Sequence, residues 1–131
     1  MQVQGMTTVV ANGGKKCPFK IIDNGKLIID NCEDLGISEE TLKLVKEGMM
    51  AACAPGGTAW PFFDFKPQVA CKTGTAQFGD PQDRTHAWFT VMAPSDDPQI
   101  VMTVLLEAAG EGSYQAAPVA KELLDYWFNE R

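Results

Sequence analysis

Several residue patterns that mark common classes of function are missing from this 131-residue sequence. It contains a single histidine, and its four cysteines form no Cys-x-x-Cys pair, so it lacks the ligand spacing of a zinc site. Its 11 basic residues are outnumbered by 17 acidic ones, and the net charge of -6 argues against a nucleic-acid surface. No apolar run approaches the roughly 20 residues of a membrane-spanning helix. We therefore expect no metal, no cofactor and no nucleic-acid partner.

One apolar stretch near the middle of the chain carries polar groups suited to an anion. Residues 69–77, Val-Ala-Cys-Lys-Thr-Gly-Thr-Ala-Gln, predict a short strand that presents Lys72 and two threonine hydroxyls and then breaks on a glycine. An ammonium group beside two hydroxyls can hold a carboxylate through charge-assisted hydrogen bonds. Gly74 allows a ligand backbone to approach, because it has no side chain. The stretch therefore predicts the wall of an anion-binding active site.

The Lys72-Thr73-Gly74 tripeptide is one of three elements found together in penicillin-recognising serine enzymes. The other two, a Ser-x-x-Lys nucleophile and a Ser-x-Asn-type motif, are absent. The three serines, at positions 38, 95 and 113, are followed three residues later by threonine, proline and alanine. A lysine at the end of a strand is ordinarily a surface residue, so the tripeptide alone does not assign a function.

Short motifs on both sides of the tripeptide supply context. In chain order, the motifs are Ala11-Asn12-Gly13-Gly14, Gly48-Met49, Gly57-Thr58, Lys72-Thr73-Gly74-Thr75-Ala76-Gln77, His86-Ala87-Trp88-Phe89, Ala93-Pro94, Glu107 and Ala116-Ala117-Pro118-Val119-Ala120-Lys121. In this order, and over nearly the whole chain, the sequence resembles class B penicillin-binding proteins, the peptidoglycan transpeptidases, and among them the elongation type. The set is far more specific than the tripeptide.

The resemblance implies roles for the residues of the lysine strand. The family's reaction is D,D-transpeptidation, which cross-links stem peptides through a serine acyl-enzyme. Lys72 would steady the terminal carboxylate of the substrate and assist proton transfer, and the hydroxyls of Thr73 and Thr75 would bind that carboxylate. The backbone N–H of Thr75 would be one oxyanion donor. Gly74 would have to stay small, since a substrate lying along this edge would collide with a Cβ. We therefore expect Lys72 and Thr75 to be catalytic, and all four residues to bind substrate.

The same resemblance implies where the chain belongs and what it meets. Residues 1–131 would form the C-terminal portion of a transpeptidase domain that is inactive alone. It would lie on the extracytoplasmic side of the bacterial cell membrane, anchored by an N-terminal segment absent from this chain. Its partners would be peptidoglycan stem peptides, β-lactam antibiotics and a companion polypeptide or N-terminal segment carrying the serine motifs. Two alternatives stay open: a β-lactamase or β-lactam sensor domain, and a non-catalytic scaffold of a cell-wall synthesis complex.

Hydrophobic periodicity predicts a mixed α/β (α+β) fold. Residues 2–11 and 114–128 place apolar side chains at helical spacing, and Ser38 caps the start of a third helix. The lysine strand is followed by two more strands, 86–93 and 100–106, in a three-stranded antiparallel meander. The resemblance implies a partial penicillin-binding/serine β-lactamase-like transpeptidase fold with the lysine strand at one edge. The last strand would then have an open edge.

The cysteines lie at positions 17, 32, 53 and 71 and allow three pairings, among which the sequence does not choose. An extracytoplasmic location, which the resemblance implies, permits disulfides. We favour Cys32 with Cys53, because these residues flank the predicted helix between them. Cys71 alternates with Lys72 along its strand, so we expect it to be a small buried residue that faces away from the site.

Two further predictions concern the ends of strands. Asn24-Gly25 lies between two β-prone runs and predicts a small hairpin over residues 19–30. His86 stands at the start of a strand, where we favour a structural or loop-orienting role over that of a general base.

Overall fold

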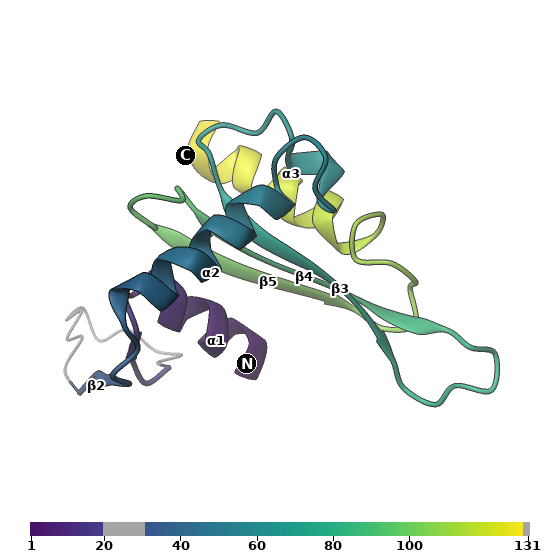
Figure 1. Ribbon diagram of the computed structural model, residues 1–131. Helices are drawn as coiled ribbons and strands as arrows, with labels where there is room; N and C mark the ends of the chain where they lie inside the picture. The colour runs from purple at the N-terminus through teal and green to yellow at the C-terminus, as the bar shows by residue number, and fades with distance from the viewer. Residues whose placement is uncertain (20–30, 130–131) are drawn as a thin grey trace.

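The computed structural model describes residues 1–19 and 31–129. Its elements are α1 (Gln2–Ala11), β1 (Lys15–Lys16), β2 (Glu33–Asp34), α2 (Glu39–Ala52), the 3-10 helix η1 (Trp60–Phe62), β3 (Ala70–Gln77), β4 (Thr85–Ala93), β5 (Ile100–Leu106) and α3 (Ala116–Asn129). Strands β3, β4 and β5 form an antiparallel sheet in sequence order, while β1 and β2 form a separate ladder. Figure 1 shows α3 and α1 on opposite sides of the larger sheet. The predicted mixed fold with a three-stranded meander is confirmed.

The central strand, β4, holds one helix on each face of the sheet. Its side chains alternate between the two faces, as in any strand. Phe89 and Val91 belong to the apolar core that includes Leu124 of α3, and both are almost fully buried. On the other face, Thr90 Oγ1 lies 2.7 Å from Thr7 Oγ1 of α1. Apolar packing thus fastens α3, and a buried hydroxyl pair helps to fasten α1.

The helices begin and end at residues suited to those positions. The side chain of Ser38 accepts a hydrogen bond from the Thr41 N–H at 3.2 Å and caps α2, as predicted. Pro118 lies in the first turn of α3, where its missing N–H removes no helical hydrogen bond. Gly13 and Gly14 follow α1 with positive φ angles, which end the helix. The predicted helices are confirmed, with α3 starting two residues later than expected.

Within the described residues, β5 has no further strand beside it, so one edge of the sheet is open. Leu105 on this strand is 39% exposed. Gln4 of α1 donates from Nε2 to the Val101 carbonyl oxygen at 2.7 Å and so occupies one carbonyl of β5. Among the residues described, every helix falls short of the length and apolarity that a membrane crossing requires.

The cysteines pair differently from the prediction. Disulfides join Cys17 to Cys32 and Cys53 to Cys71, with Cα–Cα distances of 4.2 and 5.9 Å. The favoured pairing of Cys32 with Cys53 is wrong. Cys53 lies at the C-terminal end of α2, where it meets Cys71 of β3, while Cys32 lies before the other end of this helix, whose 14 residues span about 21 Å. The β1–β2 ladder instead brings Cys17 beside Cys32. Of the hairpin predicted over residues 19–30, residues 20–30 lie outside the described residues.

Candidate active site

The four predicted site residues lie along β3, which forms the other edge of the sheet in the part of the chain described. Lys72 and Thr75 are exposed, and Thr73 and Gly74 are half-buried. Cys71, just before the lysine, is fully buried and bonded to Cys53, so its predicted burial is confirmed. Residues 72–75 therefore form an accessible strip of the edge strand, along which the side chain of the lysine alternates with those of the two threonines.

The Lys72 ammonium group is available to an anion. Its Nζ donates to the Thr73 carbonyl oxygen at 2.7 Å, and it forms no salt bridge with the described carboxylates. An ammonium has three donors, so two remain. In an antiparallel edge strand, alternate residues turn their N–H and C=O groups away from the sheet. Since Lys72 reaches the Thr73 carbonyl, that carbonyl faces the open edge, and the Thr75 N–H two residues later faces the same way.

A third threonine joins the strip from outside β3. Thr73 Oγ1 donates to Thr58 Oγ1 at 2.9 Å, and Thr58 is exposed in the segment between α2 and η1. Gly57-Thr58 is one of the family motifs in the sequence, but no role was predicted for it. A hydroxyl residue inside a family motif was the signal that could have identified it. The accessible strip and the segment beside it therefore carry three threonine hydroxyl groups together with the Lys72 ammonium.

Gly74 packs closely against a residue of the neighbouring strand. A Cβ added to it would lie 3.1 Å from the Trp88 Cβ on β4. The predicted break of the strand at Gly74 is wrong, because Gly74 pairs with Trp88 and β3 continues to Gln77. Small size at this position therefore preserves the sheet, and it also leaves the strand edge clear.

His86 connects two loops at one end of the sheet. Its Nδ1 accepts the Ala108 N–H at 3.0 Å, and its ring stacks on Phe78 with centroids 4.1 Å apart and planes 5° from parallel. A nitrogen that accepts a backbone N–H in this way is already engaged. The geometry agrees with the predicted loop-orienting role.

An ion pair closes the loop between β3 and β4. Arg84 donates from Nη2 and Nε to the two carboxylate oxygens of Asp80 at 2.7 and 3.0 Å, and the N–H groups of Gln82 and Arg84 add two more hydrogen bonds. The side-chain hydrogen bond from Arg84 is the main cause that holds the pKa of Asp80 well below its ordinary value. The carboxylate therefore stays charged and keeps the loop closed at neutral pH.

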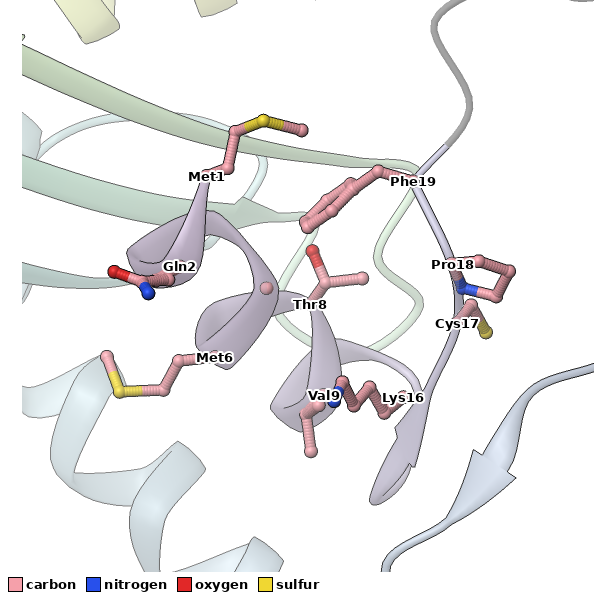
Figure 2. Close-up of a pocket in the computed structure, with 10 residues that line it drawn as sticks. Met1, Gln2, Met6, Thr8, Val9, Lys16, Cys17, Pro18 and Phe19 are labelled. Carbon is pink, nitrogen blue, oxygen red and sulfur yellow. The ribbon is translucent and has the colours of Figure 1, made fainter.

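A separate apolar pocket lies between α1 and residues 16–19, with a volume of about 470 Å³. Figure 2 shows the Phe19 ring pointing toward α1, where a Cβ on Gly5 would lie 3.4 Å from it. None of the residues on the lysine strand lines this pocket. It is therefore not part of the candidate active site.

Comparison with known proteins assigns the family. The model of the penicillin binding protein transpeptidase domain matches residues 1–125, which is almost the whole chain. The chain belongs to this family. It is 34% identical to peptidoglycan D,D-transpeptidase MrdA of Haemophilus influenzae over an alignment of 154 residues, which covers 100% of this chain and 24% of that protein. The resemblance inferred from the motifs is thus confirmed.

Solved structures of penicillin-binding transpeptidases share the fold. PBP2 of Pseudomonas aeruginosa, solved in complex with WCK 5153, is 32% identical with a TM-score of 0.81, over 98% of this chain and 29% of that one. Penicillin-binding protein A of Mycobacterium tuberculosis, solved as a penicillin G acyl-enzyme complex, is 25% identical with a TM-score of 0.69, over 96% of this chain and 31% of that one. The chain therefore spans about a quarter of the MrdA relative and less than a third of these two chains.

Proposed function

We propose that this chain forms one side of the active site of a serine-type peptidoglycan D,D-transpeptidase. A serine hydroxyl from polypeptide outside residues 1–131 attacks the carbonyl of the penultimate D-alanine of a stem peptide. The peptide bond to the terminal D-alanine breaks, D-alanine leaves with a proton on its amine, and the acyl group stays on the serine. The amine of a neighbouring stem peptide then takes the acyl group and releases the serine. Without the serine motifs, the chain alone is inactive.

One observation carries this proposal: an exposed cation without a carboxylate partner among the described residues stands beside hydroxyl groups on an open strand edge. In a chain of net charge -6, the ammonium of Lys72 is a natural site for the substrate's terminal carboxylate. The hydroxyls of Thr73 and Thr75 bind the same carboxylate, and Lys72 also assists proton transfer at the serine. The outward N–H of Thr75 serves as one oxyanion donor, a type of group whose loss typically costs about 100- to 1000-fold in rate.

β-Lactams are the second class of ligand that we propose. They acylate the same serine and place their carboxylate among the same hydroxyls. The penicillin G acyl-enzyme of the Mycobacterium tuberculosis relative supports this chemistry for the family. We also place the active site on the extracytoplasmic side of the bacterial membrane, held there by a segment outside this chain. The serine motifs come from a companion polypeptide or an N-terminal segment.

The test replaces Lys72 in the complete transpeptidase, in which this chain is combined with the serine motifs. Lys72→Ala removes a charge-assisted hydrogen bond worth about 1.5–3 kcal/mol, so acylation by a fluorescent penicillin should slow about 10- to 150-fold. Lys43→Ala is the matched control, because Lys43 lies on α2 and its side chain is 76% exposed. This control should acylate at the unaltered rate.

Three outcomes would contradict the proposal. An unchanged acylation rate for Lys72→Ala would remove the role of the lysine. Rapid hydrolysis of the penicillin adduct by the unaltered protein would favour a β-lactamase. Failure of the assembled protein to take up the penicillin label would favour a non-catalytic scaffold.

A further inference from the structure

The segment that follows α2 contacts β3 at two residues, one on each side of Lys72. Cys53, at the end of α2, forms the disulfide with Cys71, and their Cα atoms are 5.9 Å apart. Thr58 accepts the hydrogen bond of Thr73 at 2.9 Å. Residues 53–58, which we term the clamp turn, therefore hold the strand immediately before and immediately after the lysine.

The clamp turn is itself held firmly against the end of α2. The Gly57 N–H donates to the Ala54 carbonyl at 2.8 Å, and the Ala59 N–H donates to the Ala52 carbonyl at 2.9 Å. A Cβ added to Gly57 would overlap the Ala52 carbonyl, so the turn packs directly on the helix backbone. Cys53, its first residue, and Ala59, which follows its last residue, are buried in the apolar core. A turn with this many internal contacts can position the strand that it touches.

The hydroxyl pair gives Thr58 a chemical role as well as a mechanical one. A threonine hydroxyl has one proton and can accept two hydrogen bonds. Thr73 gives its proton to Thr58, and no other hydrogen bond of Thr58 is found among residues 1–19 and 31–129. When Thr73 donates to a bound carboxylate, a turn of the exposed Thr58 side chain would let its hydroxyl donate to Thr73. That second bond holds the Thr73 oxygen in place and strengthens its own bond to the anion.

We propose that the clamp turn positions the Lys72 segment and that Thr58 is the positioning residue for the Thr73 hydroxyl. The disulfide fixes the position of the strand relative to the end of α2 just before the lysine, and Thr58 directs the proton of Thr73 toward the carboxylate. This inference rests on the proposed function, because it assigns Thr58 to the same carboxylate site.

The first test compares Thr58→Val with Thr58→Ser in the complete transpeptidase. Valine has nearly the shape of threonine but no hydroxyl, whereas serine keeps the hydroxyl. With a fluorescent penicillin, the concentration that gives half the maximal acylation rate should rise about 3- to 10-fold in Thr58→Val, the effect of losing one hydrogen bond. The maximal rate should stay within about twofold, and Thr58→Ser should restore the original concentration dependence. An unchanged half-saturating concentration in Thr58→Val would overturn the role of Thr58.

The second test needs no activity. Replacing Cys53 and Cys71 together by alanine removes the tether, so the amides of Lys72 and Gly74, which face β4, should exchange with deuterium at least about 10-fold faster, while the β4 amides that face β5 keep their protection. Equal exchange with and without the disulfide would overturn the clamp. A wild-type protein that no penicillin acylates would instead overturn the proposed function, and the exchange measurement would still decide whether the turn restrains β3. If the double variant does not fold, the Thr58 comparison decides the inference.

Discussion

The loop before α3 presses a glycine against the back of the lysine strand. Gly112 is buried, and a methyl group on it would overlap the Trp88 carbonyl oxygen and lie 2.7 and 3.0 Å from the oxygen and nitrogen of Gly74. All three are backbone atoms of the paired residues Gly74 and Trp88. Backbone atoms cannot rotate away as a side chain can, so Gly112→Ala has to displace the loop or the strands.

We expect Gly112→Ala to lower the free energy of unfolding by about 1–3 kcal/mol, the usual cost of forcing extra volume into a packed site. This corresponds to a fall in Tm of roughly 2–12 °C. Gly112 does not have a positive φ, so the loss comes from the steric overlap and not from backbone strain. Because the displaced atoms include Gly74, between the two site threonines, acylation by a penicillin should slow as well.

Differential scanning calorimetry of the purified protein measures the effect. Gly48→Ala is the matched control, since Gly48 lies inside α2 and nothing is within 4 Å of an added methyl group. Alanine is favoured over glycine within a helix by about 0.5–1 kcal/mol, so this control should keep or raise Tm. A Gly112→Ala protein that melts at or above the Gly48→Ala protein would refute the steric argument.

Two other predictions concern the core and the loop between β3 and β4. Phe89 stacks on Phe62 with ring centroids 5.0 Å apart and is almost fully buried. Phe89→Ala should therefore lower the free energy of unfolding, measured with urea, by about 3–5 kcal/mol. Tyr126→Ala, at an exposed site, should change it by less than about 0.5 kcal/mol. Because Arg84 holds the pKa of Asp80 below its unfolded value, the ion pair stabilises the loop above the unfolded pKa and is lost only as the pH falls through the folded pKa. The carboxyl ¹³C signal of Asp80 should therefore still be that of the carboxylate at pH 3, and protonation by that pH would contradict the prediction.

The parts of the fold that were predicted correctly depend on local patterns. The alternation of residues 86–93 and the continuous apolar run of 100–106 are properties of the segments themselves, and both segments form strands, β4 and β5. The burial expected from these patterns is wrong, because β4 is the central strand and is buried from Phe89 to Ala93, whereas β5 is an edge strand with no fully buried residue. The Cys53–Cys71 disulfide is not local, because it depends on how α2 docks on the sheet, whereas the Cys17–Cys32 disulfide follows from the β1–β2 ladder. The sequence alone therefore did not choose among the three pairings.

The exposure pattern of the lysine strand was predicted, but its pairing at Gly74 and its contact with Thr58 were not. Lys72 and Cys71 alternate between surface and core, as a strand requires. Gly74 was expected to end the strand because glycine weakens strands, but its pairing with Trp88 outweighs that tendency. Thr58 was missed because its contact with Thr73 joins residues 15 positions apart across a turn whose path no periodicity reveals.

The two outer strands of the sheet differ in how readily they would attract another copy of the chain. On β3, the charge of Lys72 opposes edge-to-edge pairing with an identical strand, whereas β5 exposes Leu105 to solvent. If two isolated chains pair edge to edge, we therefore expect the pairing to join β5 of one chain to β5 of the other. In such a symmetric pair, the β5 edge of each chain covers the β5 edge of the other. Because no β5 edge stays open, the assembly would stop at two copies and would not grow into a fibre.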